Sequence, residues 1–243
     1  MLKLPTKNIP ILILFLLVLA SQVHVLHAQN NSFDLEELQL FSNSNEIVNG
    51  EKWVYTKKFA GHPFWGDDKW YKCDLSYKGN IYEKVDARFN IHTEEIILFI
   101  KANNEARGFI LNKQHLSWFT FYDLSNGEHT SFQYAPLIAG GKKMVYTTYH
   151  SGETQYYVQY KKYVNNVVKG NYTGEYLPKA RMFVERNGVL AELDSQKKLV
   201  QILSDRKDEL KKFMRKNKIK FDRKNPAQLA SVFKYYDSLI TKK

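Results

Sequence analysis

Catalytic residue types occur throughout this 243-residue chain, but their spacing matches no catalytic or metal-binding motif. After residue 28 the histidines never stand in the H-x-H, H-x-x-H or H-E-x-x-H arrangement of a local zinc site. The chain also lacks the G-x-S-x-G, Walker and G-x-G-x-x-G sequences, which indicate a nucleophile or a phosphate cradle. The only cysteine, Cys73, lies on the apolar side of an alternating run, so we expect a buried thiol and no disulfide. These patterns predict no catalytic residue, no metal ligand and no cofactor, and they favour a non-enzymatic protein. A hydrolase assembled from distant residues such as His62 and Asp67 stays open as an alternative.

A loop rich in aromatic residues is the first candidate binding site. The sequence GHPFWGDD at 61–68, followed closely by Trp70, places His62, Trp65 and Trp70 beside two carboxylates. Aromatic rings in such a loop can stack on a sugar ring or a peptide side chain, and they can equally fold inward to close the end of a sheet. Together with the tyrosine-rich runs that follow, the loop suggests a small-ligand or glycan-binding module as the alternative function.

Positive charge is concentrated near the C-terminus and supplies the second candidate site. Residues 195–243 contain 15 Lys and Arg against 5 Asp and Glu, whereas residues 29–194 contain 19 against 20. Such a concentration attracts anionic surfaces, although a solvated helix face is the simpler interpretation. Nucleic acid is not expected, because its recognition usually adds aromatic platforms or a recognisable fold. The partner predicted here is therefore an anionic surface or another protein. The candidate contact residues are Lys211, Lys212, Arg215 and Lys216.

The elements that must position these residues are mostly short strands. Between residues 46 and 194, apolar and polar residues alternate in runs that end at turn residues, as is typical of half-buried strands. Two hairpins are indicated by Lys78-Gly79-Asn80 and by Asn187-Gly188, the second being a preferred pair for a tight turn. The stretch 154–176 suits one bent strand or two strands that turn near Asn165-Asn166. The pattern predicts a curled or barrel-like antiparallel β-sheet, a meander of short strands.

The period of the apolar residues changes from 2 to 3.6 near residue 195. Ser195 can cap a first helix, Ser204 or Asp205 a second, and Asn225-Pro226 can begin a third. The fold class is therefore α+β, in which an antiparallel β domain is followed by two or three C-terminal α-helices. We place the β domain at 29–194 and the basic helical segment, packed on or beside it, at 195–243.

The composition and the first residues narrow the class of protein further. An aromatic share of 14% is too high for a disordered chain, and a lone cysteine excludes a disulfide-stapled miniprotein. Residues 1–28 are typical of a signal peptide, with Lys3 and Lys7 before the apolar run 11–20 and Ala28 as the expected cleavage residue. Ten apolar residues are too few to span about 30 Å of hydrocarbon, so we expect no transmembrane span in the mature chain. An uncleaved N-terminal anchor is the alternative.

Several motifs along the chain occur together in one known family. They are Ala28-Gln29, Asn49-Gly50, the G-H-P-F loop at 61–64, the pattern Y-x-G-x-x-Y-x-x-V at 77–85, and the lysine-rich ending at 197–221 with YYDSL at 235–239. In these motifs the chain resembles a family of uncharacterised exported proteins of Bacteroidetes-type bacteria. The resemblance implies a periplasmic or outer-membrane-associated location, and it implies no activity.

Overall fold

The computed structural model describes residues 32–33, 51–54, 58–102, 105–123, 127–137, 141–168 and 170–241. The predicted signal peptide at 1–28, with the expected cleavage after Ala28, lies outside these residues. Within the described part of the chain, no helix combines the length and the apolar character needed to cross a bilayer.

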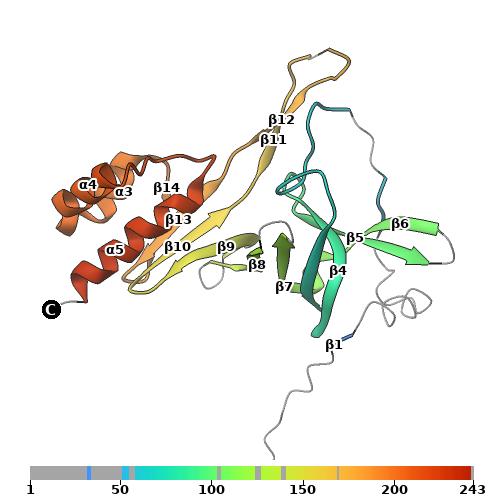
Figure 1. Ribbon diagram of the computed structural model, residues 1–243, viewed down its shortest axis with the longest axis horizontal. Helices are drawn as coiled ribbons and strands as arrows, with labels where there is room; N and C mark the ends of the chain where they lie inside the picture. The colour runs from blue at the N-terminus through green and yellow to red at the C-terminus, as the bar shows by residue number, and fades with distance from the viewer. Residues whose placement is uncertain are drawn as a thin grey trace, which may run out of the picture. The chain divides into compact units, whose positions relative to one another are not determined.

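Most of the strands belong to one mainly antiparallel β-sheet (Figure 1). The strands are β1 (Ser32–Phe33), β2 (Glu51–Lys52), β3 (Tyr71–Tyr77), β4 (Asn80–Asn90), β5 (Glu95–Ala102), β6 (Glu105–Ile110), β7 (Leu116–Asp123), β8 (Glu128–Pro136), β9 (Lys143–Ser151), β10 (Thr154–Gln159), β11 (Lys162–Asn165), β12 (Glu175–Pro178), β13 (Arg181–Arg186) and β14 (Val189–Leu193). Across the sheet they follow the order β14-β13-β10-β9-β8-β7-β3-β4-β5-β6-β2, and β1 pairs in parallel with β4. Strands β11 and β12 form a separate two-stranded sheet. The predicted antiparallel meander is confirmed, and the sheet is open, with β14 and β2 at its edges.

Both predicted hairpin turns form because their residues tolerate left-handed backbone. Lys78 and Gly79 have φ angles of 51° and 81°, and Asn187 and Gly188 have φ angles of 52° and 73°. Two successive positive φ angles give a turn whose twist matches that of antiparallel strands. In the first hairpin the turn is confined to Lys78 and Gly79, since Asn80 already belongs to β4.

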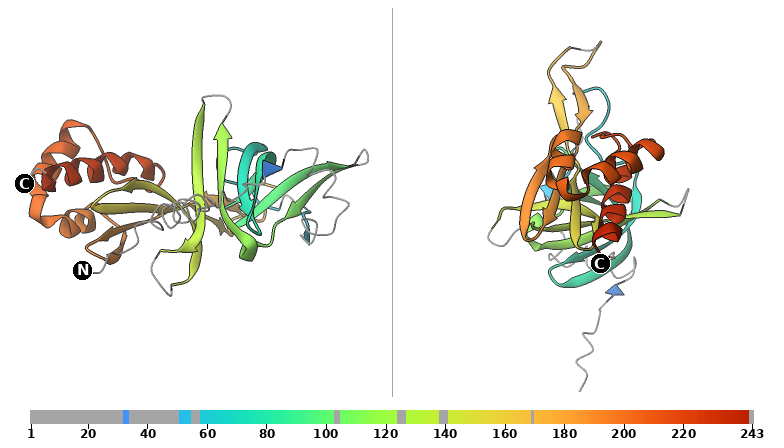
Figure 2. Two further views of the ribbon diagram at one scale, coloured as in Figure 1. Left: turned by 90° about the horizontal axis from the view of Figure 1, so that it is seen from below. Right: turned by 90° about the vertical axis from the view of Figure 1, so that its left-hand side faces the viewer.

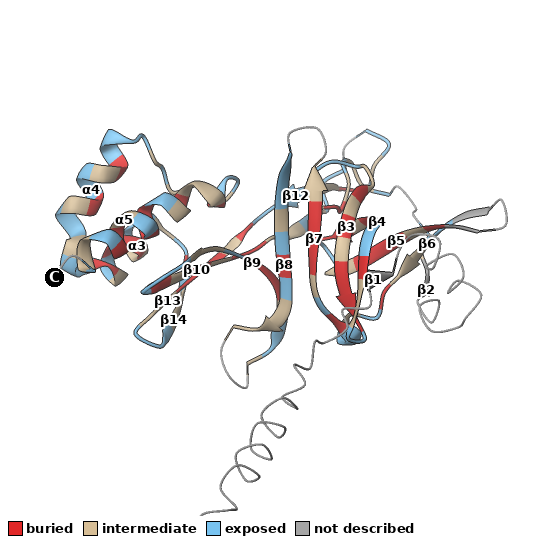
Figure 3. Cartoon of the chain, turned by 60° about the horizontal axis from the view of Figure 1, so that its bottom comes forward, coloured by how far each residue is buried: buried red, intermediate tan, exposed pale blue. Residues whose placement is uncertain are grey.

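A first hydrophobic core lies against β3, β4, β5, β7 and β8 (Figure 3). Alternation buries one side of each strand, as in β3, where Tyr71, Cys73 and Tyr77 are buried. The expected burial of the Cys73 thiol is therefore confirmed, and burial raises its pKa well above the ordinary value. Phenylalanine rings dominate the centre, where Phe119 and Phe132 stack with centroids 4.9 Å apart.

The C-terminal residues form the helices that the apolar spacing predicts. They are α3 (Gln196–Ile202), α4 (Lys207–Lys216) and α5 (Ala230–Ile240), with 3-10 turns at Ser204–Arg206 and Pro226–Leu229; a further 3-10 turn, Lys113–His115, precedes β7. Figure 2 shows these helices gathered beside β10, β13 and β14. Together they build a second core, in which Tyr156 of β10 stacks on Phe233 of α5 with centroids 4.6 Å apart. The helical segment thus packs on the sheet.

One of the predicted helix caps is confirmed and another is wrong. The Ser195 hydroxyl accepts a first-turn N–H of α3 at 3.2 Å, as predicted. The prediction that Ser204 or Asp205 caps the second helix is wrong, because α4 follows a 3-10 turn and its N-cap residue, Arg206, makes no side-chain cap. Asp205 instead accepts a hydrogen bond from the Tyr236 hydroxyl at 3.0 Å. The Asp205 carboxylate, which the local sequence predicted as a helix cap, thus bonds to Tyr236 of α5 instead.

Candidate functional site

Helices α3 and α4 present their polar sides to a shared groove. Helix α3 turns Leu199 and Val200 inward, and α4 turns Leu210 and Met214 inward. Apolar residues at this spacing form one stripe of each helix, so the lysines between them must lie on the outer sides. The sequence pattern therefore dictates that a groove between the two helices has charged walls.

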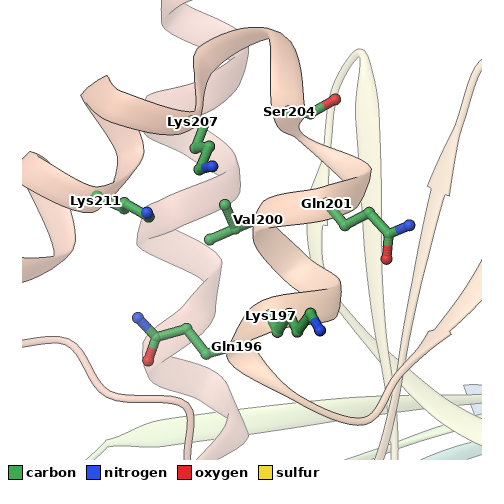
Figure 4. Close-up of a pocket in the computed structure, with 7 residues that line it drawn as sticks. All are labelled: Gln196, Lys197, Val200, Gln201, Ser204, Lys207 and Lys211. Atoms are coloured by element: carbon green, nitrogen blue, oxygen red, sulfur yellow. The ribbon is translucent and has the colours of Figure 1, made fainter.

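This groove has a volume of about 760 Å³ and opens to solvent. Lys207 and Lys211 project from α4 toward Val200 of α3, which lies between the two helices (Figure 4). Lys207 and Lys211 are one helical turn apart, so both reach the same side of α4. The groove is lined by Gln196, Lys197, Val200, Gln201, Ser204, Lys207 and Lys211.

Three of the lining residues, Lys197, Lys207 and Lys211, carry positive charge and are called here the groove lysines. Each is exposed, and no carboxylate in the described part of the chain forms an ion pair with any of them. Because like charges gathered on one surface attract counter-ions, the groove has the electrostatic character of an anion site. Gln196, Gln201 and Ser204 add neutral hydrogen-bonding groups to the same walls.

Two carboxylates close to the groove in sequence, Asp205 and Glu209, are engaged elsewhere, whereas Asp208 is exposed beside Lys207. Asp205 forms an ion pair with Arg186 at 3.0 Å and accepts a hydrogen bond from Tyr236. Burial acts to raise the pKa of Asp205, but the Tyr236 hydrogen bond and the Arg186 charge outweigh it and lower the pKa. Glu209 lies 3.5 Å from Arg206 in the same helix. These pairs leave the positive charge of the groove without local compensation from either residue.

The four residues that the sequence singled out for an anionic contact all lie on α4. Lys211, Lys212, Arg215 and Lys216 are exposed, and we call them the basic α4 face. They occupy the C-terminal half of the helix, where the helix dipole favours cations. Lys211 belongs to both sets, so the groove and the basic α4 face form one continuous cationic surface. The groove itself was not predicted, because spacing within each helix does not reveal how two helices pack.

The aromatic loop at 61–70 turns its rings toward the protein. Trp65 stacks on Phe121 with centroids 5.6 Å apart and belongs to the border of the first core. Trp70 packs on Phe99 at 5.0 Å, and His62 stacks on Phe64 at 5.9 Å. The Arg88 guanidinium lies over both the Phe64 and the Trp70 rings, so His62 and Trp70 border one cluster and Trp65 another. The glycan-binding alternative gains no support from these contacts and stays a hypothesis.

A lysine that the sequence analysis missed holds this loop in place. The Lys162 ammonium donates hydrogen bonds to the backbone carbonyls of His62, at 2.9 Å, and Phe64, at 2.8 Å. It also lies 3.4 Å from His62 Nδ1. Burial lowers the pKa of Lys162 to about 8, and burial together with the Lys162 charge lowers the pKa of His62. Lys162 is 98 residues from Phe64, so no local pattern could have indicated the contact.

The sequence also did not indicate the role of Asp237, whose carboxylate links α5 to the β9–β10 hairpin. Its carboxylate accepts hydrogen bonds from the Thr154 hydroxyl at 2.9 Å and the Thr154 amide at 3.2 Å. The same carboxylate lies 2.7 Å from His150 Nε2. The partners are 83 and 87 residues away, and the position looks like an exposed helix residue in sequence alone.

The described residues contain no group of three or more His, Cys, Asp or Glu that could hold a metal ion. Comparison with known proteins adds no assignment. No protein-family model, no curated protein and no solved structure matches the chain. The groove and the basic α4 face are therefore the features from which a function can be inferred.

Proposed function

We propose that the protein is a non-enzymatic, exported protein of the cell envelope that binds an anionic membrane surface through its C-terminal helices. The single observation that carries the proposal is the continuous surface of the groove lysines and the basic α4 face, in which no lysine of the groove has an ion-paired carboxylate within the described residues. The predicted signal peptide and the family resemblance support the envelope location.

An anionic lipid surface suits this site better than nucleic acid does. Proteins that bind single strands combine basic grooves with aromatic rings on which bases stack. The ring nearest to the basic α4 face, Phe213, stacks on Tyr235 of α5 with centroids 4.1 Å apart and is half-buried. Phe221 also packs at the border of the second core. Phe213 and Phe221 therefore pack within the helical segment and are not available for base stacking. The exposed lysines remain to contact phosphate groups.

The expected affinity is modest and depends on salt. A lysine or arginine near an anionic membrane contributes about 1 kcal/mol, so the six side chains of the surface supply about 6 kcal/mol at low ionic strength. That free energy corresponds to a dissociation constant on the order of 50 µM. Screening over about 10 Å at 0.1 M salt weakens such contacts, so binding should be reversible and salt-sensitive.

The test is co-sedimentation of the exported protein, as recovered from cells, with lipid vesicles. The wild type should sediment with phosphatidylglycerol vesicles at low salt and remain in solution with phosphatidylcholine vesicles. Replacement of the basic α4 face, as K211Q/K212Q/R215Q/K216Q, should weaken binding on the order of 100-fold or more, because four cations are lost.

The matched control removes the same number of charges from exposed lysines outside the helical segment. It is K58Q/K84Q/K142Q/K143Q, and all four positions are exposed. This control should bind nearly as well as the wild type if the helices make the contact. Equal weakening in both variants would mean that net charge alone drives association, and the proposed role of the helices would be wrong.

A further inference from the structure

The β11–β12 hairpin, which forms its own two-stranded sheet, has two faces with different surroundings. Its register pairs Tyr163 with Leu177 and Val164 with Tyr176. Because side chains alternate along a strand, the two pairs lie on opposite faces. Tyr176 packs edge-on against Phe59 at 5.3 Å, so its face is directed toward the protein. The other face carries Tyr163 and Leu177, which are 44% and 43% exposed.

The apolar exposure continues into the loop that joins the two strands. Val167 is 60% exposed and Val168 is 74% exposed. The described residues contain six large apolar side chains with high exposure, and four of them belong to this one hairpin. Figure 1 shows the hairpin and its connecting loop extending beyond the neighbouring strands. Single exposed valines are ordinary on protein surfaces, whereas here two adjacent valines are exposed in the same hairpin as the exposed Tyr163 and Leu177.

Charge around the hairpin is mainly positive. The Lys179 ammonium lies 5.4 Å above the Tyr163 ring, at the base of the exposed face. Lys162 takes no part in this charge, because its ammonium bonds to the carbonyls of His62 and Phe64, and the rest of the sequence 162–178 contains Lys169 and one carboxylate, Glu175. An apolar tip with a tyrosine and Lys179 farther back follows the order of side chains found at a bilayer interface.

We propose that the β11–β12 hairpin is an apolar anchor whose tip, Val167 and Val168, enters the boundary between head groups and acyl chains of a lipid bilayer. A strand advances about 3.3 Å per residue, so Tyr163, four residues before Val167, lies at most roughly 13 Å behind it. With the valines about 5–10 Å deep, as in other interfacial anchors, Tyr163 and Lys179 meet the head groups. The inference goes beyond the proposed function, which concerns the helices alone.

A bilayer fits the tip better than a protein partner does. A stable protein interface buries about 800 Å² on each partner, whereas the apolar part of this tip consists of two valines and one cross-strand pair. A narrow tip can enter a fluid interface without a complementary surface. Insertion of two valines gives marginal, reversible binding alone, which agrees with the general need for two signals in membrane attachment.

The experiment places a fluorophore at the tip. Val168→Cys provides a single reactive thiol, because Cys73 is fully buried and should not react. The labelled protein is held on phosphatidylcholine vesicles by a C-terminal histidine tag and a chelating lipid, so that proximity does not depend on the basic α4 face. The control is Val189→Cys, whose position is 68% exposed in another hairpin.

The label at residue 168 should shift its emission to the blue and become protected from aqueous iodide, whereas the label at 189 should show neither change. A label at 168 that iodide quenches as fully as the one at 189 would overturn the anchor. In untethered protein, V167S/V168S should lower affinity for phosphatidylglycerol vesicles at least about tenfold, since each valine contributes roughly that factor. The anchor and the proposed function of the helices can fail separately. The label on the tethered protein can shift even if K211Q/K212Q/R215Q/K216Q binds vesicles as well as the wild type does.

Discussion

Lys162 is the residue on which the path of the aromatic loop depends most directly. Its ammonium satisfies two backbone carbonyls, those of His62 and Phe64, which would otherwise lose a hydrogen-bond partner. Phe64 is buried, so the loop brings its carbonyl into a region that water reaches poorly. The sequence indicated correctly that the loop is rich in rings, but it could not identify the distant cation that bonds to the loop backbone.

The first prediction at this scale concerns pH. The pKa of Lys162 is about 8 in the folded protein and 10.5 in an exposed lysine, so the unfolded chain binds this proton more tightly. Protonation of Lys162 therefore disfavours folding below pH 8, and the penalty disappears as the pH rises from about 8 to 10.5. The free energy of unfolding of the wild type should rise with pH in this window relative to that of K162M.

Urea denaturation at several pH values measures the effect. The difference in slope between the two proteins corresponds to at most about one proton per molecule. The comparison removes contributions that both proteins share, such as Cys73, whose raised pKa acts in the opposite direction. Parallel stability curves for wild type and K162M would contradict the contact.

At the scale of elements, α5 is the helix that joins the helical segment to the sheet. Tyr156 of β10 stacks on Phe233 and donates its hydroxyl to the Pro226 carbonyl at 2.9 Å. Asp237 adds the polar contact to Thr154, whose side chain is fully buried. The apolar stripe of α5 could be predicted from its spacing. The attachment of α5 to the sheet could not be predicted. In the sequence Asp237 resembles a solvent-exposed helix residue, and nothing local shows that the β9–β10 hairpin covers it.

The second prediction follows from this attachment. Asp237→Ala removes the acceptor for the Thr154 hydroxyl and amide and leaves buried donors without a partner, so it should cost about 2–4 kcal/mol in the free energy of unfolding. Chemical denaturation measures the loss. The matched control is Asp208→Ala on the exposed side of α4, which should change stability by no more than about 0.5 kcal/mol. A similar cost for both substitutions would show that Asp237 has no special structural role.

At the scale of the whole described chain, alternation and helical spacing were enough to predict the fold class. The position where strands give way to helices, next to Ser195, also followed from the sequence. Strand order could not be predicted, since alternation fixes which side of a strand is buried and not which strand lies beside it. Thus β10 pairs with β13 across the intervening β11–β12 hairpin, and β3 lies between β4 and β7. The ambiguous stretch 154–176 resolves into β10, β11 and the start of β12.

Charge segregation is the second property of this scale. Residues 195–243 hold nearly all of the excess positive charge, and helices α3 and α4 place six of these cations on one exposed surface, because their apolar stripes face the core. The sequence therefore indicated which residues are available for an anionic contact. How α3 and α4 combine three of those cations with polar groups in a groove depends on packing, which only the structure provides.

The most direct test of membrane attachment through the helices measures the affinity of the exported protein for phosphatidylglycerol vesicles as a function of salt concentration. Cosedimentation between about 20 and 300 mM salt should show affinity falling steadily, because each cation at an anionic surface is screened. The fall should be much shallower for K211Q/K212Q/R215Q/K216Q, which lacks the basic α4 face. Binding of the wild type that is absent at low salt, or that is independent of salt, would contradict the proposal that these helices attach the protein to an anionic membrane.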